Sequence, residues 1–251
     1  LGQMMADRSL AYSASNALMS AALCHLVAPL VGLDDAQSRS LRCAALTMNL
    51  GMANLQDELA RQNQPPSPEQ RQQIQNHPFI SVAILADMGV DDAEWLRLVQ
   101  EHHEATDGSG YPDGKTELTI SQQVLRQADT YVASISPRRS RQGLPPQRAI
   151  RAIYLRSDAD KNPLGAAFIR ALGIYPPGTY VRLANNEIAV VVRRGRRANL
   201  PVVFAIVGKD GIALSTPALR DVEDKPFEIK GSVSPAEVKV VIHPARLLSR
   251  A

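Results

Sequence analysis

The sequence predicts a mainly α-helical protein, with a bundle of helices over residues 1–172 and a small antiparallel β-rich subdomain over residues 173–251. Apolar residues recur at intervals of three and four through the first two thirds of the chain, which is the period of an amphipathic helix. From Gly173 onward, short runs rich in Val and Ile alternate with turn residues. Aromatic residues make up only 4% of the chain, which favours helices packed through aliphatic side chains.

Length and composition are those of an ordinary globular protein. The 251 residues suffice for one large or two modest domains, and a hydrophobic fraction of 45% supports a real core. A net charge of +3 is too small to indicate a nucleic-acid partner. No uninterrupted apolar run reaches about 18 residues, so no membrane span is expected. The chain shows no secretion signal, and Cys24 and Cys43 lie in apolar runs, so we expect free thiols and a cytoplasmic location.

The first two predicted helices cover residues 13–33 and 34–52. The first has apolar residues three and four apart and ends at Gly32, a residue type that commonly follows a helix C-terminus. The second begins at Asp34 or Asp35, either of which can accept hydrogen bonds from the free backbone N–H groups of the first turn.

Two further helices are predicted over residues 64–90 and 91–104. The first of them carries a strong start signal at residues 67–70, Ser-Pro-Glu-Gln, with Ser at the N-cap, Pro at the first helical position and Gln at the third. A glycine-rich loop is predicted after the second helix, over residues 105–119.

Helices over residues 120–136 and 146–157 complete the helical part, and the β-rich part begins near residues 170–176. Asn185-Asn186 and residues 209–211, Lys-Asp-Gly, are predicted turns of a small antiparallel sheet or partial barrel. The last strand-like runs cover residues 227–233 and 238–248.

Two adjacent histidines, His102 and His103, stand between Glu101 and Glu104 at the end of a predicted helix. Successive helical residues point about 100° apart, so the pair cannot share one narrow face, but from a helix end both imidazoles can reach one metal centre. Imidazole suits iron, manganese or zinc. A solvated helix end is the alternative for the pair alone.

Two more candidate ligands lie on neighbouring predicted helices. A surface or capping role is the alternative for His77, and Asp129 is a carboxylate in the middle of an amphipathic helix. A buried carboxylate needs a cation, a metal or several donors, whereas a solvated one carries no information. His77, His102, His103 and Asp129 come from three successive helices, which is how helical bundles build metal sites.

The run HHEATDGSGYPDG, residues 102–114, resembles the hallmark of HD-GYP domains, a bacterial subgroup of the HD-domain phosphodiesterases. The resemblance extends over about residues 10–160 and includes His77-Pro78. It implies an all-helical bundle and hydrolysis of cyclic di-GMP at a centre of two or three metals, which clamp the phosphate and activate a water. The resemblance is most specific across Asp107, Gly108, Ser109, Gly110, Tyr111 and Pro112.

The resemblance also implies which metal ligands the chain keeps. His77, the pair His102 and His103, and Asp129 fall on ligand positions of the family. These four residues leave room for one residual divalent metal, iron or manganese, or for none.

Five polar positions of the family pattern are replaced in this chain. The signature His-Asp falls on Met48 and Asn49, the following lysine on Met52, and a Glu and a His of the first helix on Tyr12 and Asn16. Asn49 is a far poorer bridge between two metals than an aspartate, and the Met48 thioether suits a hard hydrolytic metal poorly. Met52 cannot neutralise a phosphate as a lysine would. The resemblance therefore implies that no catalytic set is intact.

Two basic stretches offer groups that can bind phosphate. Arg138 and Arg141 match arginines of the family and can grip phosphate bidentately, with a solvated basic turn as the alternative. Residues 193–197, Arg-Arg-Gly-Arg-Arg, are predicted to be a solvated hairpin tip, with phosphate or membrane-surface contact as the alternative.

Three functional hypotheses follow. The first is a catalytically impaired HD-GYP-like protein that acts in cyclic di-GMP signalling as a regulatory or protein-interaction module. The glycine-rich loop, which this chain keeps, supports this hypothesis, because in this family the loop is implicated in contacts with diguanylate cyclases of the GGDEF type. The expected partners are cyclic di-GMP, such a cyclase or another signalling protein. The second is an active metal-dependent cyclic di-GMP phosphodiesterase with a mononuclear or altered centre. The third is a structural output domain that binds no nucleotide.

Overall fold

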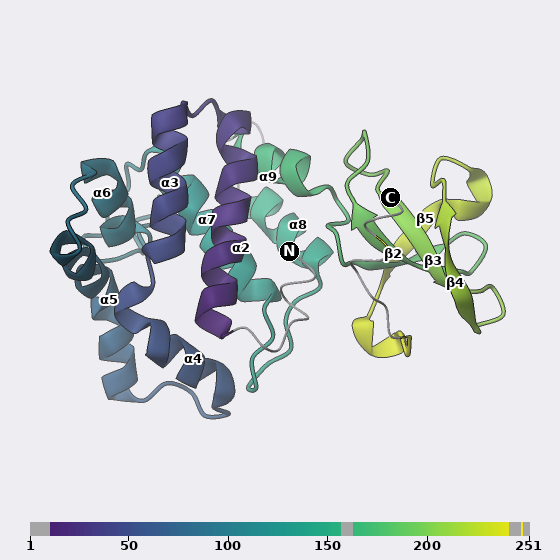
Figure 1. The fold of residues 1–251 in the computed structure, drawn as a ribbon, viewed down its shortest axis with the longest axis horizontal. Coiled ribbons are helices and arrows are strands. Elements are labelled where there is room, and N and C mark those ends of the chain that lie inside the picture. Colours follow the sequence, from purple (N-terminus) through teal and green to yellow (C-terminus); the bar gives the residue numbers. More distant parts are fainter. Residues whose placement is uncertain (1–10, 157–162, 241–246, 248–251) are drawn as a thin grey trace.

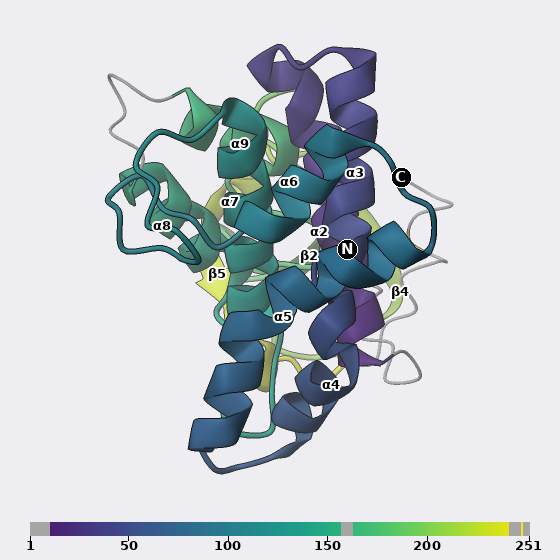
Figure 2. The ribbon, with the colours of Figure 1, turned by 90° about the vertical axis from the view of Figure 1, so that its left-hand side faces the viewer.

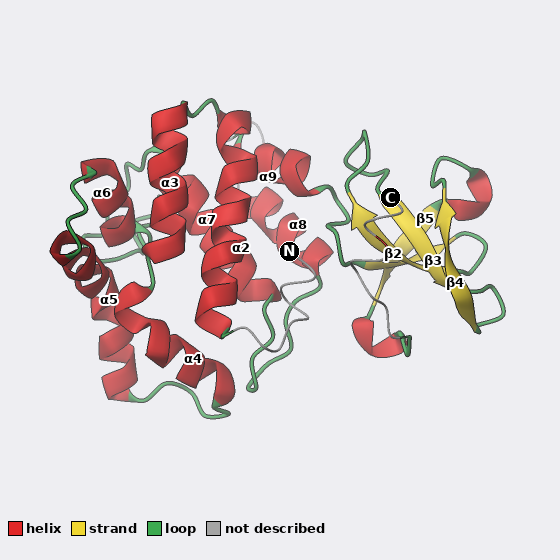
Figure 3. Ribbon diagram, in the orientation of Figure 1, coloured by secondary structure: helices red, strands yellow, loops and turns green. Residues whose placement is uncertain are grey.

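The computed structural model describes residues 11–156, 163–240 and 247, and it consists of a helical bundle followed by a five-stranded antiparallel sheet (Figures 1 and 3). The bundle and the sheet lie side by side along the long axis of the molecule. The chain passes from one to the other between the last helix, α9 (Leu164–Leu172), and the first strand, β1 (Tyr180–Leu183). The predicted fold class is confirmed; the exact division into two domains stays a prediction.

The first two helices follow their sequence signals closely. Helix α2 (Tyr12–Val27) continues as the short 3-10 helix η1 (Ala28–Val31) and ends at Gly32, whose φ of 78° is the left-handed conformation that glycine adopts without strain. Helix α3 (Asp35–Thr47) begins with a capping box in which Asp34 accepts a hydrogen bond from the backbone N–H of Gln37 at 2.8 Å.

The chain departs from the prediction after α3. The predicted helix does not continue to residue 52, because α3 ends at Thr47 and a separate 3-10 turn, η2 (Leu50–Met52), leads into α4 (Ala53–Arg61). Helix α5 crosses at this point: a Cβ on Gly51 would lie 2.7 Å from the carbonyl oxygen of His77. Ser81 of α5 fixes the turn, because its Oγ accepts from Gly51 N–H and donates to the Met48 carbonyl, both at 2.9 Å.

The next helices, α5 (Pro68–Asp87) and α6 (Ala93–Glu101), carry the predicted start signals. Ser67 and Gln70 form a reciprocal capping box, and Asp92 caps α6 through the backbone N–H of Trp95 at 3.0 Å. Figure 2 shows α5 and α6 next to each other on one side of the bundle.

Helices α7 (Ile120–Ile135) and α8 (Pro146–Arg156) confirm their predictions, whereas α9 was missed. Its signal is visible in retrospect, because its buried apolar residues recur at intervals of three and four. The core of the bundle combines buried side chains from α2, α3, α7, α8 and α9. Cys24 is free and buried there; Cys43 is free and only partly buried.

After β1, the strands of the sheet are β2 (Ile188–Arg193), β3 (Val202–Val207), β4 (Ala213–Arg220) and β5 (Ile229–Val233). The strand order is β4-β3-β2-β1-β5, with all neighbours antiparallel. Both predicted turns are confirmed: Asn186 (φ 71°) and Gly211 (φ 80°) take the left-handed conformation. No strand forms over residues 238–240, and residues 241–246 and 248–251 of that predicted strand lie outside the described part of the chain.

One helical stretch, Tyr12–Val31, is long and apolar enough to cross a membrane by length and composition, with a mean hydropathy of 1.5 over its best window. The expectation drawn from uninterrupted apolar runs overlooked it, because Ser, Asn and His residues interrupt the run. Within the structure this stretch packs against α3 and α7, and Met19, Leu23 and Val27 lie in the core of the bundle. It therefore has the place of a core helix.

Candidate metal centre

The imidazoles of His77, His102 and His103 meet at one point of the bundle, where one ring nitrogen from each lies within 4.8 Å of the others. His77 lies inside α5, and the adjacent pair follows the last residue of α6. His77 and His102 are buried, at 0% and 1% exposure, so the surface role considered for His77 is wrong. Among the described residues, these three form the one group of His, Cys, Asp or Glu close enough to share an ion.

Two of the rings are held in a defined orientation by the backbone. His77 donates its Nδ1–H to the carbonyl of Ile74, and His102 donates its Nδ1–H to the carbonyl of Val99 at 2.7 Å. In a neutral imidazole the other nitrogen then carries a lone pair. The two Nε2 atoms lie 3.1 Å apart, so two lone pairs face each other. A bound cation resolves this repulsion, and a metal-binding histidine usually donates its other ring N–H to a carbonyl, as these two rings do.

The third ring completes the set. His103 Nε2 is buried and has no hydrogen-bond partner among the described residues. Its ring stacks on Tyr111, with ring centroids 4.5 Å apart and an interplanar angle of 25°. Burial lowers the pKa of all three histidines, to about 4 for His77 and about 3 for His102. Neutral imidazoles are the form that ligates metals, so these residues fit one divalent ion.

Asp129, the predicted fourth ligand, is not part of this three-histidine group. It lies on α7, where burial raises the pKa of its carboxyl to about 6, against the lowering effects of Arg138, Arg126 and Asn16. The carboxylate therefore already has cationic and polar neighbours within the chain. Its role as a metal ligand stays a prediction.

The positions that replace the family's ligands are occupied by a different set of contacts. Met48 is fully buried and belongs to the hydrophobic core, and Met52 is half-buried. Asn49 is 8% exposed, and its Nδ2 approaches Asn16 Oδ1 at 3.5 Å. Neither amide offers a carboxylate to a second metal, and none of these residues is in the histidine group.

The two predicted phosphate-binding arginines also have partners inside the chain. Arg138 donates from Nε to the Tyr12 hydroxyl at 3.1 Å, and its guanidinium carbon lies 5.1 Å from the centroid of that ring. Arg141 donates from Nη2 to the carbonyl of Ala133 at 2.5 Å. A phosphate ligand would have to compete with the Tyr12 contact for Arg138.

Glu104 fixes the glycine-rich loop beside the histidines. The residue is fully buried, and its carboxylate accepts hydrogen bonds from the backbone N–H groups of Asp113 at 2.6 Å and Lys115 at 2.8 Å. Arg126 of α7 donates to the carbonyls of His103 and Glu104 at 2.6 and 2.9 Å. A Cβ on Gly110 would lie 2.4 Å from the backbone nitrogen of Ala105, so the loop lies directly on the backbone after α6.

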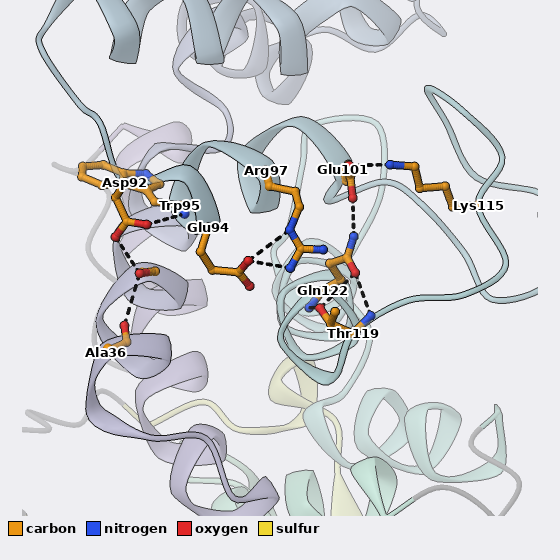
Figure 4. Close-up of polar contacts among 10 residues, drawn as sticks. Ala36, Asp92, Glu94, Trp95, Arg97, Glu101, Lys115, Thr119 and Gln122 are labelled. Atoms are coloured by element: carbon orange, nitrogen blue, oxygen red, sulfur yellow. Dashed lines mark hydrogen bonds and ion pairs between the residues drawn. The ribbon is translucent and has the colours of Figure 1, made fainter.

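Glu101 makes a second connection between the loop and the bundle. Figure 4 shows its buried carboxylate between Lys115 of the loop, whose Nζ lies at 2.6 Å, and Gln122 of α7. Sequence reasoning noted both glutamates beside the histidines but assigned neither a role, and it missed Arg126. The available signal was a carboxylate on each side of the histidine pair, followed by a loop rich in backbone donors.

The lowered pKa values of the three histidines predict that the metal-free chain loses stability in acid. His77 has a pKa of about 4 in the folded chain against 6.5 ordinarily, so below pH 6.5 the unfolded chain binds protons that the folded chain does not. The stability that the neutral His77 ring contributes is complete above pH 6.5. It falls as the pH drops towards 4, by on the order of 3 kcal/mol for His77 alone. Asp129 opposes it, because its raised pKa makes the folded chain bind a proton near pH 6.

Thermal melts of the metal-free protein across this range check the prediction. We expect the melting temperature to fall as the pH drops, and to fall more steeply in Asp129→Asn, which removes the opposing proton uptake. A melting temperature that stays constant between pH 6.5 and 4 would contradict it.

Comparison with known proteins identifies relatives. A model of the HD domain family matches residues 1–162. A cyclic di-GMP phosphodiesterase of Pseudomonas aeruginosa is 28% identical over 186 residues, which cover 72% of this chain and 45% of that protein. The cyclic di-GMP phosphodiesterase PdeB of Borreliella burgdorferi is 25% identical over 211 residues, covering 82% of this chain and 54% of that protein. The chain thus spans about half the length of the curated relatives it matches.

Solved structures with a similar arrangement include an HDG"Y"P protein from Bdellovibrio bacteriovorus, with a TM-score of 0.47 and 20% identity, covering 62% of this chain and 50% of that one. The HD domain of the L. monocytogenes phosphodiesterase PgpH has a TM-score of 0.45 and 13% identity, covering 63% of this chain and 90% of that one. These likenesses are too weak to carry a functional argument.

Proposed function

The chain belongs to the HD domain family, and from that membership we propose that it acts in cyclic di-GMP signalling as a regulatory or protein-interaction module whose phosphodiesterase chemistry is impaired. Its curated relatives are named cyclic di-GMP phosphodiesterases, which supports the ligand class. The impairment rests on this chain's own residues.

The observation that carries the proposal is the placement of Met48 and Asn49. Where the family pattern has a histidine and a bridging aspartate, this chain has a thioether inside the hydrophobic core and a neutral amide beside Asn16. Two-metal phosphoester hydrolysis requires both ions to be held close together, which a bridging carboxylate achieves. The three histidines can hold one ion, which would supply Lewis-acid polarisation of a phosphoryl oxygen but not the second metal.

The glycine-rich loop supports an interaction role. Glu104 and Arg126 hold its two ends against the bundle, while Asp107, Ser109 and Asp113 are exposed on it. A rigid loop with exposed polar side chains loses little entropy on binding a partner. A diguanylate cyclase of the GGDEF type is the partner that the resemblance of this loop favours.

Metal content and turnover test the proposal together. The purified chain is loaded with Mn²⁺ or Fe²⁺, its bound metal is counted by mass spectrometry, and it is incubated with cyclic di-GMP beside the Pseudomonas aeruginosa relative as a positive control. We expect at most one metal per chain and no linear pGpG or GMP above the metal-free blank. Two metals per chain with clear pGpG formation would overturn the proposal.

A second candidate function is a slow phosphodiesterase with a mononuclear centre, and the geometry of the three histidines favours it over a purely structural role. In that case product forms at one metal per chain and disappears in His102→Ala. Calorimetry with cyclic di-GMP separates both candidates from a structural output domain, which would bind no nucleotide.

A further inference from the structure

A basic cleft separates the end of α9 from the turn that joins β2 to β3. Its volume is about 570 Å³, a size that accommodates a small organic ligand. Figure 1 shows α9 on the side of the helical bundle next to the sheet, so the cleft draws residues from both parts of the molecule. Arg170 comes from α9, and Arg193, Arg194 and Arg196 come from the end of β2 and the turn after it.

The charges of this cleft are not balanced by the protein. Half of its lining residues are arginines and none is acidic. All four arginines are exposed, and none forms an ion pair with a described carboxylate. Four guanidinium groups around one hollow repel one another, and an anion bound among them removes that repulsion.

The turn is held in place before any ligand arrives. A Cβ on Gly195 would lie 1.7 Å from the carbonyl oxygen of Leu200, so only glycine fits where the turn closes on itself. The turn is also tied to the bundle, because Ile174 N–H donates to the carbonyl of Ala198 at 2.8 Å. Preorganised binding groups lower the entropic cost of capturing a ligand.

The end of α9 alone would disfavour an anion, because the carbonyl end of a helix carries partial negative charge. Arg194 counters this: its Nη1 donates to the carbonyl of Arg170 at 2.7 Å and brings a positive charge to the helix end. The remaining guanidinium groups of Arg170, Arg193 and Arg196 have no side-chain partner among the described residues and are free to face a ligand.

From this geometry we propose that the cleft binds a soluble anion carrying two or more phosphoryl groups. Planar guanidinium groups bind phosphate oxygens bidentately, and several of them around one hollow match a diphosphate better than a single phosphate. Such a ligand joins Arg170 of the bundle to Arg193 and Arg196 of the sheet, so its binding stiffens the connection between them. The site is separate from the histidine cluster and does not depend on the function proposed above. It takes up the phosphate-contact alternative for residues 193–197, and the solvated hairpin tip stays the competing prediction.

Titration calorimetry of the full chain with inorganic pyrophosphate at low salt tests the site. We expect a dissociation constant below about 1 mM, weakened at least about tenfold in Arg193→Gln and in Arg196→Gln. Arg196→Lys keeps the charge but loses the bidentate geometry, so it should fall between wild type and Arg196→Gln. Arg197→Gln is the matched control, because it removes the same charge from the same turn at a residue that does not line the cleft.

Further arms separate the sources of binding. His102→Ala should bind pyrophosphate normally, which excludes a metal-bridged signal, and so should Arg138→Gln. Vesicles of phosphatidylglycerol test the alternative source of phosphoryl groups, a lipid surface. No binding of pyrophosphate, an equal loss in Arg197→Gln, or binding to vesicles alone would overturn the proposal. Arg193, Arg196 and Arg197 are exposed, so the melting temperatures of their variants should stay at the wild-type value.

Discussion

Replacing His102 by alanine is expected to abolish one-to-one metal binding, with an affinity for Mn²⁺ or Fe²⁺ lowered by more than about 100-fold. His102 is the central ring of the cluster: its Nε2 lies 3.1 Å from that of His77, and its ring centroid lies 4.0 Å from that of His103. Without it, two imidazoles remain, one from α5 and one from the turn after α6, which is too few to hold an ion against water. Calorimetric titration of the metal-free chain with Mn²⁺ or Fe²⁺ measures the change in affinity.

The matched control for this substitution is His25→Gln. His25 is an exposed histidine on α2, whose Nδ1 lies 3.3 Å from Arg42, and it takes no part in the cluster. We expect wild-type metal affinity in this variant. Because His102 is buried, His102→Gln is tested beside His102→Ala to keep the volume filled. Unchanged affinity in both His102 variants would show that the ion binds elsewhere.

The capping signals explain why much of the bundle can be predicted from the sequence. Asp34, Ser67 and Thr119 each sit three residues before a Gln whose side chain returns the hydrogen bond, a pattern that depends on local sequence alone. Local patterns of this kind place the histidines on their elements. They do not reveal that α3 stops at Thr47, because the reason is the crossing of α5 at Gly51.

The candidate site is predictable only in part for the same reason. Residue types indicate that His77, His102 and His103 can ligate a metal, and the structure brings them together. The contact of Arg138 with Tyr12 joins residues 126 positions apart, so no local pattern contains it. Tyr12 is one of the replaced positions of the family pattern. Its hydroxyl and ring now contact Arg138, an arginine that the resemblance assigns to phosphate binding.

Replacing Glu104 by alanine is expected to release the glycine-rich loop and to destabilise the chain by about 3–5 kcal/mol. The fully buried carboxylate accepts from two backbone N–H groups, those of Asp113 and Lys115. Alanine leaves both donors without that acceptor and opens a space behind the loop. Denaturant unfolding measures the stability, and hydrogen exchange of residues 107–115 measures the release of the loop.

A graded series distinguishes the loss of these hydrogen bonds from a general loss of charge. Glu104→Gln keeps one acceptor oxygen and nearly the same volume, so its loss of stability should be smaller than that of Glu104→Ala. Glu117→Ala removes the same side chain from an exposed position of the same loop and should change stability by less than about 0.5 kcal/mol. If Glu104→Ala left the exchange of the loop unchanged, the loop would be held by Gly110 packing and by Glu101 with Lys115 instead. Because His103 stacks on Tyr111 of this loop, the Glu104→Ala variant should also weaken metal binding, which would link the glycine-rich loop to the three histidines.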